Sequence, residues 1–318
     1  MNAAVPRWAR LAGGAAVLAV LVRRLGIGPF LDGLRMISFW PLAAATAITA
    51  ATTVCSAWRW TLVARGLGVG LPLHTAIAAY YRSQFLNTVL PGGVLGDVHR
   101  GLSQGRAAGD VGRGVRAVVW ERSAGQVVQA ILTLIVLLAL DPPTRRAAPL
   151  IVAGLAVVLL AGAIALLRAV RGASRIARAA SGDLRAGLLA RRAWPGVTVA
   201  SATVVAGHAA TFLLAARTAG SSAGVDRLLP LVMLVLMAGA LPINLGGWGP
   251  REGVAAWAFG AAGLGAAQGV ASATVFGVMT LVASSPGALV LAWAWRRGAG
   301  PLPLTVRERA LASVGAHG

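Results

Sequence analysis

Apolar runs of bilayer length alternate along the chain with short stretches that hold most of the polar residues. A helix needs about 20 apolar residues to cross the hydrocarbon core of a membrane. A shorter run at 11–22 follows basic residues as in a signal peptide, but no small-residue cleavage site follows it cleanly, so we expect an uncleaved first helix. The runs of spanning character lie at 37–57, 124–140, 149–167, 196–216 and 270–295.

These runs predict an all-α polytopic membrane protein, a helical bundle with about six full spans, because a lipid-exposed backbone must satisfy its own hydrogen bonds. We expect residues 1–297 to form a single transmembrane domain and residues 298–318 to form a short, disordered cytoplasmic tail. The composition agrees with this class, since 57% of the residues are hydrophobic and 12% are charged. A soluble domain usually carries about 25% charged residues.

The formal net charge of +20 comes from 29 basic residues, all of them Arg. They flank the apolar segments, as the positive-inside rule expects, so we exclude nucleic acid as a partner and expect anionic lipid headgroups instead. We place the Arg-rich loop at 168–195 in the cytoplasm together with both termini, in a multi-pass protein of the plasma (inner) membrane. Apolar and basic residues of this loop fall on opposite faces of a helix, which fits either a helix lying in the interface or a solvated loop.

A Pro-Gly-Gly turn interrupts the apolar segment that starts at residue 73. Pro removes a backbone donor and Gly permits positive φ, so the turn stops a helix. A new segment begins near Gly96, and we expect Asp97 to be its N-cap. Asp97 and Arg100 are three residues apart, so on a helix they share a face and can pair. The turn consists of Pro91, Gly92 and Gly93.

A second apolar run, at 228–241, has about half the length of a span and breaks at Pro242. Arg251 and Glu252 follow the break, and a short apolar run follows them at 254–264. This pattern resembles a re-entrant hairpin, because irregular backbone at membrane depth is tolerated only where it is buried in protein or lines a cavity. The segment between Pro242 and the charged pair contains Asn244, Gly246, Gly247, Gly249 and Pro250.

The two interrupted segments share one plan: an apolar half-helix, a Pro, a Gly-Gly pair and then charged residues. In the orientation chosen above, the first enters from the cytoplasm and the second from outside, which suggests an inverted repeat. Paired broken helices in the two halves of a chain point to a transporter-like site at the midplane. The alternative is that both are tight turns between spans, with interfacial charges.

Glu121 and Arg122 stand at the predicted start of the span at 124–140. Adjacent residues point about 100° apart on a helix, so these two cannot pair face to face. Each needs another partner, unless both are snorkelling side chains at the interface. The candidate partners are Arg100 or Arg251 for Glu121, and Asp97 or Glu252 for Arg122.

Three motifs, which occur along the chain in the order expected for the family, carry a resemblance to the lysylphosphatidylglycerol synthase transmembrane family. Glu121-Arg122 resembles the family's middle pair, and the stretch 241–253 resembles its C-terminal signature. The resemblance implies a helical bundle with re-entrant elements, which in the two-domain synthases is the part thought to move aminoacylated lipid between leaflets. Only residues 296–318 follow the bundle here, so we expect no transferase domain. The N-terminal signature is carried by Phe85, Leu86, Asn87, Leu90, Pro91, Gly92, Gly93, Gly96, Asp97 and Arg100.

The sequence offers no catalytic constellation, so we expect neither an enzyme nor a cofactor or metal site. The four His residues lack metal-ligand spacing, and His208, within an apolar run, is expected to be a core residue. They are His74, His99, His208 and His317.

Our hypothesis is a flippase-like protein that binds and translocates a lipid with a polar headgroup. Arg100, Arg122 and Arg251 would attract the phosphate, since Arg presents a fork of donors. Asp97 and Glu252 would hold these Arg residues or receive a cationic headgroup. The glycines would let backbone N–H groups approach the headgroup.

The candidate lipid is an anionic or aminoacylated phospholipid or a polyprenyl-linked lipid. A homo-oligomer or an enzyme partner remains open. The alternatives are, second, a non-catalytic partner subunit of a lipid- or envelope-modifying enzyme and, third, a membrane lipid-linked transferase. The candidate site comprises Asn87, Pro91, Gly92, Gly93, Gly96, Asp97, Arg100, Glu121, Arg122, Pro242, Asn244, Gly246, Gly247, Gly249, Arg251 and Glu252.

Overall fold

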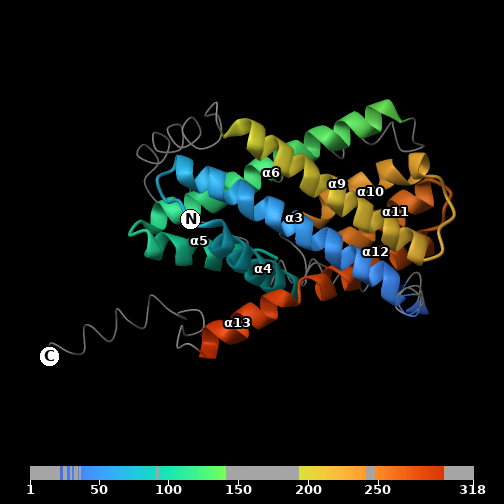
Figure 1. The fold of residues 1–318 in the computed structure, drawn as a ribbon. Helices are drawn as coiled ribbons and strands as arrows, with labels where there is room; N and C mark the ends of the chain where they lie inside the picture. The colour runs from blue at the N-terminus through green and yellow to red at the C-terminus, as the bar shows by residue number, and fades with distance from the viewer. Residues whose placement is uncertain are drawn as a thin grey trace, which may run out of the picture.

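The computed structural model describes residues 37–90, 93–140, 193–240 and 248–296, with isolated positions between 22 and 35. These residues fold into a bundle of α-helices (Figure 1). The helices are α3 (Phe39–Gly66), α4 (Leu73–Val89), α5 (Leu95–Ala107), α6 (Val111–Ala139), α9 (Trp194–Thr218), α10 (Val225–Gly239), α11 (Pro250–Ala261), α12 (Ala266–Ala283) and α13 (Pro286–Arg296).

Four helical segments are long and apolar enough to cross a membrane: α3, α6, α9 and the pair α12–α13, counted from Ala266 to Ala294. They confirm the spans predicted around 37–57, 124–140, 196–216 and 270–295. The predicted runs at 11–22 and 149–167 lie outside the described residues, as do the basic loop at 168–192 and the tail at 298–318.

The α6 helix begins earlier than the hydrophobic pattern predicts. It starts at Val111, with Asp110 as its N-cap, so Glu121 and Arg122 lie well inside the helix, and the prediction that they stand at the start of the apolar span concerns only the part of the helix that follows them. At a rise of 1.5 Å per residue, Glu121 lies about 15 Å into the helix. Arg113 and Arg116 in the first turns hid this extension, because a helix can project polar turns beyond the apolar core.

The other helices are shorter than a full crossing. α4, α5, α10 and α11 have 17, 13, 15 and 12 residues, which corresponds to roughly 18–26 Å each, less than the bilayer core of about 30 Å. The predicted interruptions are present, since α4 ends at Val89 before Gly93 (φ 60°) and α10 ends at Gly239 before α11 begins at Pro250. Predicted residues outside the described part of the chain are Pro91, Gly92, Pro242, Asn244, Gly246 and Gly247.

Among the described residues, the helices occur twice in the order long, short, short, long. α3, α4, α5 and α6 form the first set, and α9, α10, α11 and the pair α12–α13 form the second. α3 packs against α9 at the centre of the bundle (Figure 1). Each of these two also packs against α6 and α12, while α5 packs on α6 and α11 packs on α12. The two sets therefore share one packing scheme.

A close approach of α5 and α6 aligns the charged residues of the first set. Gly101 and Gly105, four residues apart, face Gly114 of α6. A Cβ added to Gly105 would lie 2.5 Å from the Cα of Val111, so the backbones meet where side chains are absent. Small residues at this spacing are a common device for close helix packing in membranes. The contact places one face of α5 directly beside Glu121.

We predict that Gly105→Ala destabilises the protein while Gly260→Ala does not. The added methyl at Gly105 collides with backbone, and overpacking of this kind costs about 1–3 kcal/mol. At Gly260, also within a helix, the nearest atom would be 3.7 Å away, an ordinary contact. Thermal unfolding of the detergent-purified variants, followed by tryptophan fluorescence, measures both. Equal midpoints for the two variants would contradict the close contact.

Candidate functional site

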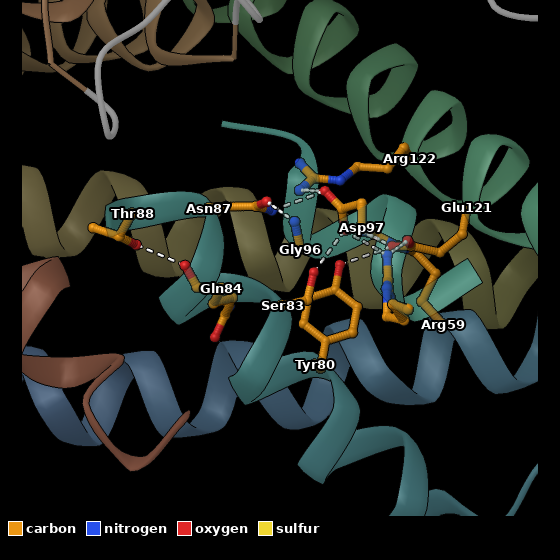
Figure 2. A network of polar contacts seen from close by, with 11 residues as sticks. Arg59, Tyr80, Ser83, Gln84, Asn87, Thr88, Gly96, Asp97, Glu121 and Arg122 are labelled. Atoms are coloured by element: carbon orange, nitrogen blue, oxygen red, sulfur yellow. Dashed lines mark hydrogen bonds and ion pairs between the residues drawn. The ribbon is translucent and has the colours of Figure 1, made fainter. Parts of the chain in front are cut away.

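Asp97 forms the first centre of a polar cluster between α4, α5 and α6 (Figure 2). Its Oδ1 accepts hydrogen bonds from Ser83 Oγ and Arg100 Nη2, both at 3.0 Å. Its Oδ2 accepts from Asn87 Nδ2 at 2.9 Å and from Arg122 Nη2. The predicted pair Asp97–Arg100 is therefore confirmed. So is the pairing of Arg122 with Asp97, one of the two candidates.

Asp97 is not the N-cap of α5, contrary to the sequence prediction. The helix begins at Leu95 with Val94 as N-cap, and Asp97 occupies the third helical position. The side chain of Asn87 makes the connection instead, because its Oδ1 accepts from the backbone N–H of Gly96 at 2.8 Å while its Nδ2 donates to Asp97. Asn87 thus joins the last turn of α4 to the first turn of α5 across the interruption between the two helices.

Glu121 is the second centre, and its side chain is completely buried. Its Oε1 accepts from Arg59 Nε at 2.9 Å, from a second nitrogen of Arg59 and from Tyr80 OH at 3.1 Å. Its Oε2 accepts from Arg100 Nη2 at 2.9 Å, which confirms Arg100 and excludes Arg251 as its partner. Arg59 also donates to Ser201 Oγ on α9 at 3.1 Å. One carboxylate therefore connects α3, α4, α5 and α6, and through Arg59 also α9.

Arg100 connects the two centres. Its guanidinium carbon lies 4.4 Å from the ring centre of Trp60 and 4.2 Å from that of Tyr80. Such cation–π contacts are strongest where the cation is removed from water, and Arg100 is 1% exposed. One nitrogen, Nη2, bridges Asp97 and Glu121.

The sequence reading missed Arg59, Tyr80 and Ser83. The apolar run predicted at 37–57 left Arg59 just beyond the end of the span, whereas the residue is buried inside α3, which continues to Gly66. An Arg preceded by a full apolar run was the signal available, because an intramembrane cation requires an acidic partner. The hydroxyls of Tyr80 and Ser83 gave no comparable signal.

The charges of this cluster do not cancel. Three guanidinium groups face two carboxylates, which leaves a net charge of +1. Within the described part of the chain, Arg122 donates only to Asp97. Its side chain is 42% exposed, so further N–H groups of its five-donor fork can reach a ligand. The excess positive charge is therefore accessible at Arg122. The cluster members are Arg59, Asp97, Arg100, Glu121 and Arg122.

Arg251 and Glu252 form a separate, neutral pair at the start of α11. Arg251 donates to Glu252 Oε1 through Nε at 2.9 Å and Nη2 at 2.6 Å. Glu252 Oε2 accepts from the N–H of Gly249 at 2.7 Å, and Gly249 has a φ of 116°. The Arg251 guanidinium lies 5.2 Å from the Trp248 ring centre and 5.3 Å from that of Phe276. The candidate pairings Glu121–Arg251 and Arg122–Glu252 are therefore not formed, because Arg251 and Glu252 pair with each other.

Among the residues that the structure describes, no three His, Cys, Asp or Glu side chains lie close enough together to hold a metal ion. His208, which the sequence places in the core, is instead an exposed residue.

We predict that Glu121→Gln lowers the free energy of unfolding by about 3–5 kcal/mol, because it leaves buried arginines without their counter-charge. Asp110→Asn is the matched control. Asp110 pairs with Arg113 at the surface, at 3.2 Å with both side chains largely exposed, and Asn caps a helix as well as Asp does. An exposed pair contributes at most about 1 kcal/mol. Denaturant titration of both variants in detergent tests this, and a Glu121→Gln loss no greater than the control's would show that the buried network does not hold the helices.

The family model described as the lysylphosphatidylglycerol synthase TM region matches residues 7–287. Searches of curated proteins and of solved structures found no match. The family match spans both broken segments and every residue of the polar cluster, which confirms the resemblance carried by the motifs. The chain therefore belongs to the lysylphosphatidylglycerol synthase transmembrane family.

Proposed function

We propose that this membrane protein binds the phosphate of a lipid headgroup at Arg122 and carries that headgroup between the two leaflets. The observation that supports this most directly is the net charge of +1 in a buried cluster whose excess cation is accessible. Charge is expensive in a low-dielectric medium unless it is paired. A phosphodiester with one negative charge would bring the cluster to neutrality.

The chemistry of Arg122 suits a phosphate. Arg offers planar, fixed donors that can bind two phosphate oxygens at once, and such charge-assisted hydrogen bonds are about twice as strong as neutral ones. Asp97 orients one nitrogen of this fork, and Asp97 is in turn held by Ser83 and Asn87. The guanidinium is therefore fixed in place before a lipid arrives.

The architecture supports transport. Two interrupted pairs of short helices, α4–α5 and α10–α11, occupy corresponding places in the two helix sets. We propose that each pair is a re-entrant hairpin and that the sets form an inverted repeat, with about six full spans once the runs at 11–22 and 149–167 are added. Paired broken helices of this kind flank the substrate site of many transporters.

The two halves would have different roles. In the first, Glu121 and Arg122 of α6 complete a charged cluster with α5. In the second, the corresponding contact of α11 on α12 involves Phe276, which stacks on an arginine already neutralised by Glu252. We propose that the first half binds the headgroup, while Arg251 and Glu252 hold α11 in position.

The distribution of surface arginines supports the proposed orientation. Arg65 ends α3, Arg106 ends α5, and Arg113 and Arg116 lie in the first turns of α6. These helix ends meet, since a Cβ at Gly68 would lie 3.7 Å from Arg113. By the positive-inside rule we assign this end of the bundle to the cytoplasm. We propose that the protein lies in the plasma membrane with both termini in the cytoplasm.

The contacts of the acidic residues support the proposal of a non-enzymatic role. Asp97 and Glu121 each accept at least three hydrogen bonds, and each is paired with two arginines. Carboxylates whose oxygens are already occupied by arginines and other donors have little capacity left to act on a substrate. We therefore rank the partner-subunit role second and the transferase third.

We predict that Arg122→Gln slows lipid movement by about ten- to a hundredfold, the equivalent of the 1.5–3 kcal/mol of one charge-assisted hydrogen bond. The measurement is dithionite bleaching of fluorescent phosphatidylglycerol in proteoliposomes. Arg113→Gln, which removes an exposed cation near the same end of α6, is the control and should match the wild type. Parallel liposomes carry labelled aminoacylated phosphatidylglycerol, phosphatidylcholine or a polyprenyl phosphate.

Movement of any phosphate lipid by the wild type, lost in Arg122→Gln and kept in Arg113→Gln, supports the proposal, and the fastest lipid identifies the headgroup class. No movement of any of the four lipids by a folded, monodisperse protein would overturn transport. That result would favour the partner subunit, which co-purification with a lipid-modifying enzyme would then detect.

A further inference from the structure

We infer that a hydrated path for the headgroup runs along the inner face of α6, past Gln126 and Gln129 and opposite His208 of α9. The inference rests on the proposed function, because it describes where a headgroup bound at Arg122 would travel. It is carried by a different observation, the position of uncharged polar side chains on the inward faces of two spanning helices.

The exposed apolar residues of α6 define its lipid-facing side. Successive residues turn by about 100°, so they form one stripe, and Val127 within it is 58% exposed. The stripe consists of Val127, Ile131, Leu134, Ile135 and Leu138.

The opposite face of α6 carries a line of polar side chains. Arg122, Gln126, Gln129 and Thr133 follow one another at intervals of four, three and four residues, which keeps them on one face. They extend over about 16 Å at 1.5 Å per residue, roughly half of the bilayer core. Amides inside a spanning helix are costly unless their polar atoms are hydrogen-bonded.

Gln126 shows that this line is not a closed network. Its Oε1 is buried and lacks a hydrogen-bond partner among the described residues. Thr133, by contrast, returns its hydroxyl to the backbone carbonyl of Gln129 at 2.8 Å. Buried polar atoms are nearly always bonded to protein or to water, so the Gln126 amide calls for water or a ligand beside it.

The position of His208 on α9 points to the same space. Val199 and Thr203 lie on the lipid-facing side of α9, and Val199 is 61% exposed. His208 is nine residues from Val199, which places it on the opposite face, in line with Ser201, whose hydroxyl binds Arg59. A side chain on this inward face would normally be buried, yet His208 is exposed.

His208 therefore opens into space within the bundle. Arg59 and Arg122 are the charged residues that act on it electrostatically, and α6 and α9 pack against each other (Figure 1). The inward faces of the two helices thus border one region, which begins at Arg122.

Uncharged donors suit this stretch of the path. A second fixed cation beyond Arg122 would hold the phosphate too tightly to release it, whereas conduction requires binding that is favourable but weak and spread over several sites. Amide and imidazole groups replace part of the hydration shell of a phosphate without trapping it. The acyl chains can remain in the lipid, since only the headgroup needs the polar face.

Cysteine accessibility tests the path without requiring transport. The chain has one Cys, Cys55, so a Cys55→Ala background can receive Gln126→Cys, Gln129→Cys or His208→Cys. Val127→Cys and Val199→Cys are the lipid-facing controls. A charged methanethiosulfonate reagent reacts with the hydrated thiolate, and labelling after solubilisation in SDS confirms that each thiol is present.

We expect the three path positions to react at least about tenfold faster than the controls, because a thiol in lipid does not ionise. Glycerol phosphate should slow the reaction at Gln126→Cys in a background that retains Arg122. Path positions that react no faster than Val127→Cys would overturn the inference.

A transport readout separates this inference from the proposed function. The double variant Gln126→Leu/Gln129→Leu leaves the charged cluster intact and should slow phosphatidylglycerol movement by at least about tenfold. This factor corresponds to the loss of one hydrogen bond of about 1.4 kcal/mol. Val127→Leu is the control. If the wild type moves lipid and the double variant moves it equally fast, the path is wrong and the function stands. If the path thiols react but the wild type moves no lipid, the hydrated path stands and the function fails.

Discussion

The structure depends on two carboxylates that have no access to bulk water. Glu121 is wholly buried and Asp97 nearly so, and an ionised group in that position persists only if it is paired and hydrogen-bonded. The partners of the two carboxylates come from α3, α4, α5 and α6, and α9 is reached through Arg59. Satisfying the carboxylates therefore fixes the relative positions of five helices, and the close glycine contact between α5 and α6 is what makes these distances reachable.

The same constraint explains why the two halves of the bundle differ chemically while sharing one packing scheme. Glu252 is satisfied locally, by the adjacent Arg251 and the backbone of Gly249. Nothing further is required from α12, which presents Phe276 and Gly277 to the arginine. Asp97 and Glu121 instead share three arginines and end with one positive charge in excess. Local satisfaction gives a structural pair, and shared, unbalanced satisfaction gives a site that can attract an anion.

The sequence could predict the parts of this arrangement that depend on local chemistry. The length of the apolar runs predicts the spans, and the Pro and Gly residues predict where helices are interrupted. The spacing of Asp97 and Arg100 predicts that they pair. For contacts between distant residues, the sequence limited the possible partners without choosing among them, since Asp97 and Glu252 were equal candidates for Arg122. Arg59 and Glu121 are 62 residues apart, so only the fold shows that they meet. The N-cap prediction for Asp97 failed because α5 begins two residues earlier, at Leu95, where the Asp97 carboxylate is bound by Arg100 and Arg122.

A single fixed charge followed by neutral polar groups is a consistent solution to a conflict in lipid transport. A headgroup must be drawn out of water, which requires a strong attraction, and it must also leave, which requires that no later position bind it more strongly. In the transport that we propose, Arg122 would supply the attraction at the start of the inward face of α6. The amides of Gln126 and Gln129 and the imidazole of His208 would then exchange with water along the proposed path. The excess charge and the uncharged polar line are thus two parts of one requirement, and the buried carboxylates maintain both by holding Arg122 at the point where the line begins.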